Sequence, residues 1–258
     1  MALRSLRSSE LAPHLSPSLG VRGQSIPAFE VKFLVTERQG QEAESWARDH
    51  LALDIHGNPN DNGTYQTTSL YTDTTALDVY RGTPKYRRRK YRVRRYGSGT
   101  ELYLERKTRK GDRVAKRRDV VPTGELPLMA HPLSATDWQG HWFHSRLMKR
   151  QLRPVCRISY RRTAFVGQSS EGPLRLTLDR DVQGALTSDW DLESNLETRT
   201  ALEGWVVLEL KFQTAMPAPF KRLVQDMKLN PTGVSKYRRC LEAWELPAAI
   251  CKQEMKYA

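Results

Sequence analysis

The sequence has 258 residues, of which 38% are hydrophobic and 28% are charged, a balance typical of a globular chain rather than a disordered one. The formal net charge of +13 predicts a polyanionic partner: nucleic acid, a phosphorylated small molecule or an anionic membrane surface. No apolar run approaches the roughly eighteen residues needed to span a bilayer, and the three cysteines form no CxxC pair. We therefore expect no transmembrane segment, no zinc ribbon and no disulfide framework, with reduced thiols in a cytoplasmic protein.

The first 27 residues are rich in Ser, Pro, Leu and Arg and show no core pattern, so we expect a disordered extension. A transit peptide is the alternative, because acidic residues are scarce there. The patterned part of the chain predicts one folded domain over residues 28–246, and residues 247–258 are expected to form a C-terminal tail.

Alternating apolar and polar residues are the clearest pattern in this domain. Period-2 alternation predicts strands at residues 29–35, 101–107, 174–179 and 206–212. In the first of these, Phe33 and Val35 share one face, whereas Glu30 and Lys32 share the other. In the last, Glu209 lies on the polar face.

The segment KYRRRKYRVRRYG at residues 85–97 carries eight Lys or Arg residues and lacks the apolar stripe of a helix. Its Tyr and Val residues favour a strand, with Tyr91 and Val93 on one face. The opposite face would then carry the basic side chains Arg88, Lys90, Arg92 and Arg94. We also predict a strand near residues 69–74, and a less regular one at residues 158–165.

Four segments have the composition of helices: residues 36–54, 138–152, 220–229 and 235–246. The first begins with Thr36 and Gln39 at the spacing of a capping box. Trp46, Leu51 and Leu53 would form the apolar side of that helix.

The charged faces of the strands admit two interpretations. An ordinary antiparallel sheet would bury its apolar face and leave its charges in water. If the sheet instead closed into a barrel, the charged faces would line its interior and the apolar faces would turn outward under the helices. A charged interior of that kind would be a ligand site, because pairs of Arg or Lys at i and i+2 can each grip a phosphate.

A series of short motifs occurs in one order along the chain: E-x-K-F, S-L-Y-x-D, Y-R-x-R-x-Y-G, L-E-R-K, K-x-R, R-P-x-x-R-x-x-Y-x-R-x-A-F, L-R-x-T-L-D, L-E-x-K and S-K-Y. This order resembles the VTC domain, the polyphosphate-polymerase module of the vacuolar transporter chaperone complex, over about residues 28–245. That domain belongs to the triphosphate tunnel metalloenzymes. The resemblance implies an α+β fold with a closed, eight-stranded antiparallel tunnel barrel, a charged lumen and helices on the outside.

The resemblance also implies roles for individual residues. The catalytic cations would be Lys32, Arg92, Arg94, Lys107, Lys116, Arg162, Arg175 and Lys236. Ser235, Arg118 and Glu30 would help to bind the nucleotide, and Glu209 would hold the metal. Because Arg162 is in phase with Ile158 and Tyr160, its place in the lumen leads us to expect a β-bulge in that strand.

The implied function is an ATP-dependent polyphosphate polymerase that moves the γ-phosphate of ATP onto a growing polyphosphate chain. Phosphoryl transfer mainly requires alignment and neutralising charge, which Arg, Lys and a glutamate-bound Mn²⁺ or Mg²⁺ supply. Pyrophosphate or phosphate would serve as primer, no specific nucleic acid is expected, and a membrane partner is left open. The alternatives are an inorganic or nucleoside triphosphatase with the same tunnel, and a non-catalytic binder of polyphosphate or RNA.

Overall fold

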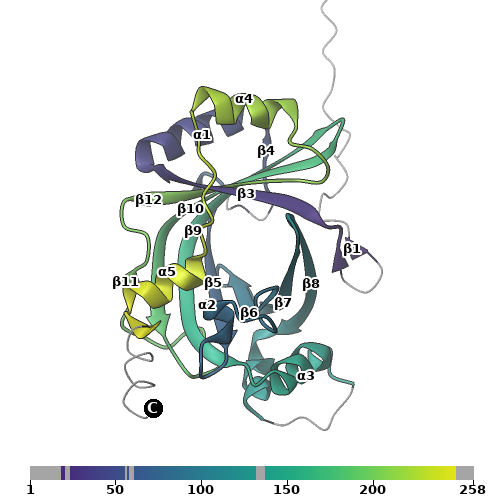
Figure 1. Ribbon diagram of the computed structural model, residues 1–258, viewed down its shortest axis with the longest axis vertical. Helices are drawn as coiled ribbons and strands as arrows, with labels where there is room; N and C mark the ends of the chain where they lie inside the picture. Colours follow the sequence, from purple (N-terminus) through teal and green to yellow (C-terminus); the bar gives the residue numbers. More distant parts are fainter. Residues whose placement is uncertain (1–18, 21–23, 56, 58–60, 132–136, 248–258) are drawn as a thin grey trace, which may run out of the picture.

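Eight antiparallel strands close into a barrel in the computed structural model, which describes residues 19–20, 24–55, 57, 61–131 and 137–247 (Figure 1). Around the barrel the order is β8, β3, β12, β10, β9, β5, β6 and β7, and β7 pairs with β8 to complete the circle. Their bounds are β3 (Ala28–Thr36), β5 (Thr64–Asp73), β6 (Arg89–Tyr96), β7 (Glu101–Lys110), β8 (Arg113–Pro122), β9 (Arg153–Ser169), β10 (Gly172–Leu186) and β12 (Trp205–Phe212). The fold expected from the resemblance is confirmed.

Helices cover the outside of the barrel. Figure 1 looks along the barrel, with two helices above β3, one below the β7–β8 hairpin and one beside β9 and β10. In that order these are α1 (Glu37–His50), α4 (Ala218–Asp226), α3 (His141–Lys149) and α5 (Lys236–Ala243). The short elements are α2 (Asp78–Arg81), the 3₁₀ helix η2 (Thr123–Ala130), β1 (Leu19–Gly20), β2 (Gln24–Ser25), β4 (Ala52–Leu53) and β11 (Arg199–Thr200). No helix among the described residues is both long and apolar enough to cross a membrane.

The barrel is closed by two seams of unequal length on either side of β8. The β7–β8 hairpin is paired along its whole length, whereas β3 meets β8 only at Ala28 and Phe29. Farther along, β8 leaves β3 and pairs with β2, where Ser25 Oγ accepts a hydrogen bond from the Lys116 amide at 2.9 Å. This part of the predicted disordered extension is therefore a strand, while residues 1–18 lie outside the described residues.

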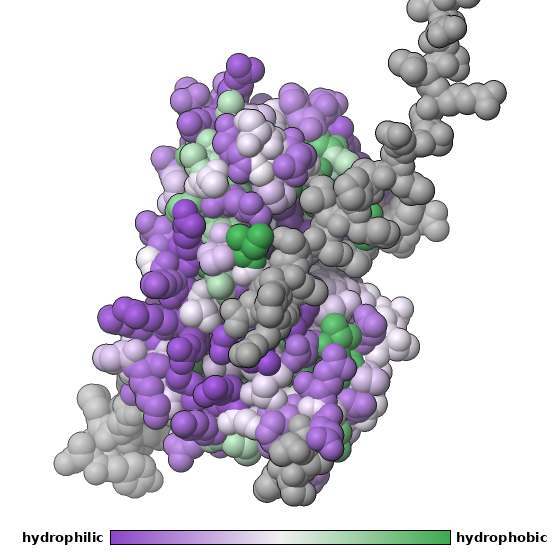
Figure 2. Space-filling model, turned by 90° about the vertical axis from the view of Figure 1, so that its right-hand side faces the viewer, coloured by the Kyte–Doolittle hydropathy of each residue, from purple (hydrophilic) through white to green (hydrophobic). Residues whose placement is uncertain are grey.

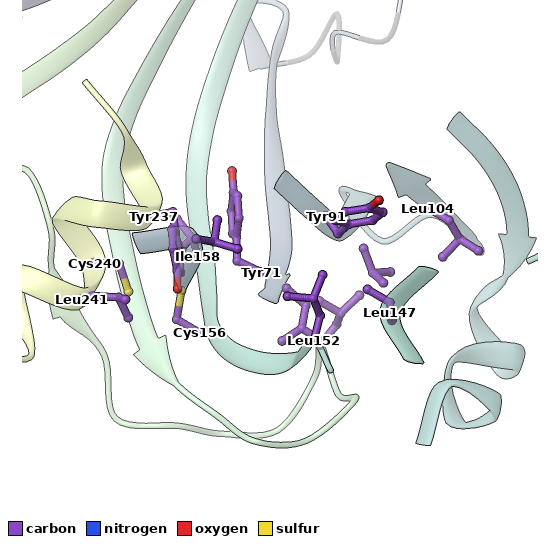
Figure 3. Close-up of a cluster of buried hydrophobic side chains, with 14 of the residues drawn as sticks. Tyr71, Tyr91, Leu104, Leu147, Leu152, Cys156, Ile158, Tyr237, Cys240 and Leu241 are labelled. Atoms are coloured by element: carbon purple, nitrogen blue, oxygen red, sulfur yellow. The ribbon is translucent and has the colours of Figure 1, made fainter. Parts of the chain in front are cut away.

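Two apolar clusters surround the barrel wall. The first packs Phe33, Phe165 and Leu208 of the strands against α1 and α4. The second cluster lies on the opposite side, and Figure 3 shows it extending from α5, with Tyr237 and Cys240, to the leucines near α3. Both clusters take their strand residues mainly from the apolar faces that the alternation predicted, so the outward turn of those faces is confirmed.

The predicted helices form, but each is shorter than its pattern. Thr36 caps α1 with the predicted capping box: its hydroxyl accepts from the Gln39 amide, and the Gln39 side chain accepts from the Thr36 amide. The helix ends at His50, so Leu53 does not belong to its apolar side; it lies in β4 with 40% of its surface exposed. The side view in Figure 2 shows a mostly hydrophilic surface with small, separate hydrophobic patches.

Two details of the predicted strands are corrected. Strand β6 begins at Arg89, so Arg87 and Arg88 lie in the preceding turn and not on either face of the strand. The expected bulge occurs in this stretch but on the other strand: the register of β9 against β10 shifts between Arg161 and Ser159, and the extra residue lies on β10, between Arg180 and Gln183. The apparent phase conflict disappears because Tyr160 itself lines the lumen beside Arg162.

Candidate functional site

The polar faces of the strands point into the barrel, and their charged side chains line its lumen. Arg94 of β6 has 3% of its surface exposed, and its guanidinium donates to Ser69 Oγ at 2.9 Å and to Tyr160 Oη at 2.8 Å. Tyr91 and Val93 of the same strand point outward into an apolar cluster. The closed-barrel interpretation of the charged faces is therefore correct, and the half-solvated sheet is not.

The structure places every predicted cation on the lumen side of its element. They are Lys32 on β3, Arg92 and Arg94 on β6, Lys107 on β7, Lys116 and Arg118 on β8, Arg162 on β9, Arg175 on β10 and Lys236 at the start of α5. Because like charges repel, most of these cations are paired with carboxylates, and two of the carboxylates, Glu105 and Asp179, each hold more than one cation.

Glu105 of β7 is the central carboxylate, with 1% of its surface exposed. One of its oxygens accepts from Arg92 Nε at 2.7 Å and the other from Arg118 Nη2 at 2.6 Å, with Lys116 Nζ at 3.2 Å. Burial alone would raise the pKa of this carboxyl, but the charges of Arg92, Lys116 and Arg118 hold it well below its ordinary value. Glu105 lies in the strand predicted at residues 101–107 and in the L-E-R-K motif, but no role was predicted for it.

Asp179 of β10 is a second carboxylate that the sequence analysis assigned no role. Arg162 grips it through two hydrogen bonds of 2.6 and 2.7 Å, and Lys236 Nζ adds a third at 2.5 Å. Although burial opposes ionisation, the charges of Arg162 and Lys236 lower the pKa of Asp179. The signal was available, because this aspartate ends the L-R-x-T-L-D motif.

Glu209 of β12 lies beside Lys32 of β3, with 3.3 Å between the carboxylate and Nζ. Burial works against its ionisation, yet Lys32 and Lys107 hold its pKa well below the usual range, so it is anionic. Glu30, paired with Lys107, borders the same cavity. Two ionisable carboxylates beside one cavity fit an oxygen-liganded divalent cation. The described residues contain no group of three His, Cys, Asp or Glu side chains, so phosphate oxygens and water would complete its shell.

A cavity of about 380 Å³ opens from this part of the lumen. Its charged walls include Glu30, Glu209, Arg94, Lys116, Arg118, Arg162 and Arg175. Tyr65, Tyr96 and Tyr103 add aromatic surface, and Ile26 and Ile55 add apolar surface. The volume and the mixed lining suit a small ligand with one highly anionic end.

Tyrosine hydroxyls support four of the lumen arginines. Arg92 donates to Tyr71 at 2.9 Å, and Arg118 donates to Tyr96 at 3.2 Å. Arg94 and Arg175 bond Tyr160 and Tyr65 in the same way, at 2.8 and 3.4 Å. Burial would raise the pKa of Tyr71 and of Tyr96, but the surrounding arginines, Arg94 among them, lower both to about 7. These phenols are therefore hydrogen-bonding groups whose charge changes near neutral pH.

Lys90 also lies in the lumen. It was predicted to lie on the basic face of its strand, but no role was assigned to it. Its Nζ donates to Ser235 Oγ at 2.9 Å, and no carboxylate of the described chain lies within ion-pair distance of it. Burial lowers the pKa of Lys90 to about 8, and the charges of Lys32 and Lys107 act in the same direction. The pKa of Lys116 is likewise lowered to about 8 by burial. Ser235 itself caps α5 and accepts from the Arg238 amide.

This chain is similar to one protein family and, more weakly, to several solved structures. A sequence profile of the VTC domain matches residues 28–245. A Bacillus halodurans structure described as a candidate adenylate cyclase has a TM-score of 0.50 and 12% identity, covering 83% of this chain and 95% of that one. The Pyrococcus horikoshii protein PH1819 has a TM-score of 0.45 and 12% identity, with 83% and 98% covered. A Hippeastrum protein described as having a dominant triphosphatase activity has a TM-score of 0.44 and 15% identity, with 81% and 93% covered. Among proteins with curated functions, no sequence matches this chain.

Proposed function

This chain belongs to the VTC-domain family, and from that premise we propose that its lumen transfers the γ-phosphate of ATP to an inorganic polyphosphate chain, releasing ADP. Pyrophosphate or phosphate would start the chain as a primer. The observation that carries the proposal is the convergence of lysines and arginines from different strands on one lumen, where they outnumber the carboxylates. Such a surplus of buried positive charge calls for a ligand with several negative charges.

The arginines, lysines and carboxylates of the lumen would have different roles in phosphoryl transfer. Arginines such as Arg94 and Arg162 offer planar pairs of donors to the non-bridging phosphate oxygens, and lysines offer point charges. Their bonds to tyrosines and carboxylates hold them in place before the substrate arrives, so little reorganisation is needed. Mn²⁺ or Mg²⁺ held by Glu209, with Glu30 beside it, would neutralise phosphate charge when bound.

The pairing of the lumen carboxylates supports polyphosphate, rather than water, as the acceptor of the phosphoryl group. Each one described is paired with a lysine or arginine: Glu30, Asp54, Glu105, Asp179 and Glu209. In Glu105, Asp179 and Glu209 the neighbouring cations lower the pKa, and a carboxylate with a lowered pKa is a weak base for removing a proton from water. A terminal phosphate oxygen of polyphosphate is already anionic: it forms the new P–O bond as the bond to ADP breaks, and no proton has to move.

A triphosphatase is the second candidate, and the lumen tyrosines favour it. Hydrolysis must remove a proton from water, and a tyrosine whose pKa neighbouring arginines lower to about 7 is partly phenolate at neutral pH and can accept that proton. Tyr71 and Tyr96 have this property.

The test is to incubate the protein with ATP and Mn²⁺ or Mg²⁺ and to resolve the products on a gel that separates polyphosphate from phosphate. We expect ADP to appear with a ladder of lengthening chains when pyrophosphate is supplied. Phosphate and ADP without chains would identify the triphosphatase. Absence of turnover with either metal, in protein that binds tripolyphosphate, would leave only a non-catalytic binder.

A further inference from the structure

The outer face of the β7–β8 hairpin carries two arginines directly opposite each other. Arg106 of β7 and Arg117 of β8 are register partners, and Arg106 faces Tyr91 on its other side. Helix α3 lies against this face: the ring of Trp142 is 4.0 Å from Arg117 Cζ and 5.9 Å from Arg106 Cζ. Two guanidinium groups and one indole are therefore gathered outside the lumen.

Neither arginine has a carboxylate within ion-pair distance among the described residues; Asp119, on the same face of β8, feels the charge of Arg117 only from farther away. Other outer arginines do form ion pairs, as Arg95 does with Glu193. Like charges directly opposite each other across two strands destabilise the sheet. Burial lowers the pKa of Arg106; Tyr91 opposes this shift, whereas the positive charges of Arg89 and Arg117 add to it. The fold thus holds together two charges that repel each other.

Hydrogen-bond donors in this cluster also lack acceptors. Arg106 Nε, Arg117 Nε and Trp142 Nε1 are all buried atoms without a hydrogen-bond partner, and so is the hydroxyl of Tyr91 next to Arg106. Buried donors of this kind are normally satisfied, because leaving one unpaired costs free energy. The Tyr91 hydroxyl could serve Arg106 alone, whereas an anion with several oxygens could accept from all three donors and offset the charge of the two guanidinium groups.

We propose that Arg106, Arg117 and Trp142 form an anion site on the outer wall of the barrel that binds a phosphate group. A phosphate dianion would offset the repulsion between the guanidinium groups and accept hydrogen bonds from them and from the indole. The site is separate from the lumen, since Glu105, Lys107, Lys116 and Arg118 alternate with the two arginines and point inward. It does not depend on the proposed polymerase activity.

The indole N–H of Trp142 supplies a direct readout. In ¹⁵N-labelled full-length protein, Trp142→Phe identifies its resonance among the six tryptophans. Titration with inorganic phosphate at constant ionic strength should shift this resonance along a saturating curve. In Arg117→Met, which keeps a side chain able to cover the indole, we expect the apparent affinity to fall at least about tenfold.

Arg113 is the matched control on the same hairpin, because its guanidinium also stacks on an aromatic ring, 5.2 Å from the centre of Phe29. Arg113→Met should leave the Trp142 titration unchanged. If Arg117→Met does not fold, Arg106→Gln measures the same loss from the other strand. No movement of the Trp142 resonance, or equal weakening by Arg113→Met, would overturn the site.

Two sources of the phosphate group are separated by repeating the titration with tripolyphosphate in a lumen variant, Arg94→Met. Equal affinity for phosphate and tripolyphosphate at Trp142 would identify free phosphate as the ligand. Much tighter binding of tripolyphosphate, still lost in Arg117→Met, would identify the end of a phosphate chain.

Discussion

At the scale of single residues, each central arginine of the lumen is held from two sides. Arg92 bonds Glu105 and Tyr71, and Arg94 bonds Ser69 and Tyr160. Holding a cation in one orientation before its ligand arrives strengthens its contact with the ligand, because the ordering cost has already been met in folding. Removing such an arginine therefore removes an aligned contact to the substrate as well as a charge.

We predict that Arg92→Ala and Arg94→Ala each abolish most turnover. Each removes a charge-assisted contact of about 1.5–3 kcal/mol in a desolvated site, a loss of roughly tenfold to more than a hundredfold. Arg87→Ala, in the exposed turn before β6, is the control and should retain nearly full activity. Steady-state ADP release measures all three, and equal losses would contradict the lumen assignment of Arg92 and Arg94.

Glu209→Gln tests metal dependence. The amide keeps the shape of the side chain but loses the anionic ligand, so activity should collapse while binding of a non-hydrolysable ATP analogue partly survives. Glu203→Gln, in an exposed turn before the same strand, should behave like the wild type. Full wild-type activity in excess chelator would rule out this mechanism.

The lumen should bind polyanions less tightly as the pH rises from 7 to 9. Burial lowers the pKa of Lys90 and of Lys116 to about 8, so both lose positive charge in this range. Tyr71 and Tyr96, whose pKa values arginines lower to about 7, become anionic over the same range. Calorimetric titration of tripolyphosphate at several pH values measures the effect. Lys90→Met should make the affinity for tripolyphosphate depend less on pH. An affinity that does not change between pH 7 and 9 would contradict the predicted changes in charge.

At the scale of elements, β8 and α5 show where sequence patterns fail. The outer face of β8 carries Arg113, Arg117 and Asp119, so neither face is apolar and no alternation reveals the strand. Helix α5 was predicted, but its pattern says nothing about where it docks. It packs at Gly184 of β10, where an added Cβ would lie 2.3 Å from Cys240 Sγ. This close approach places Ser235 and Lys236 at the lumen.

Gly184→Ala should therefore displace α5 and lower the free energy of unfolding by about 1–3 kcal/mol, as overpacking does. Activity should fall as well, because Lys236 would move away from Asp179. Denaturant unfolding measures the stability. The double variant Gly184→Ala/Cys240→Ala removes the closest clash and should recover part of the activity, whereas Gly124→Ala, with open space around it, should change neither property. A Gly184→Ala protein as active as the wild type would contradict this docking.

At the scale of the whole molecule, closure of the barrel decides what kind of anion can bind. Arg94, Lys116, Arg118, Arg162 and Arg175, from four different strands, line one cavity, so a short linear phosphate there would meet several of them together. An open basic surface would instead collect nucleic acid along its length, with an affinity that grows with the number of phosphates contacted.

We predict tight, saturable binding of tripolyphosphate at the lumen and weak binding of single-stranded RNA that falls steeply with salt. Titrations of both ligands at two salt concentrations make the comparison. Arg162→Met should weaken the binding of tripolyphosphate much more than the binding of RNA. If RNA binds more tightly at physiological salt and tripolyphosphate cannot displace it, the proposed function of the lumen is wrong and the protein is a nucleic-acid binder.

The sequence by itself determined which side chains share a face on β3, β6, β7, β10 and β12, because period-2 alternation is a local property of an extended backbone. It also located the helices to within a few residues. Only the tertiary structure decided that the charged faces turn inward, since this depends on β8 closing the circle between β7 and β3. The roles of Glu105 and Asp179 emerged at the same point, because alternation shows which face a carboxylate occupies but not which cations on the neighbouring strands, or at the start of α5, will contact it.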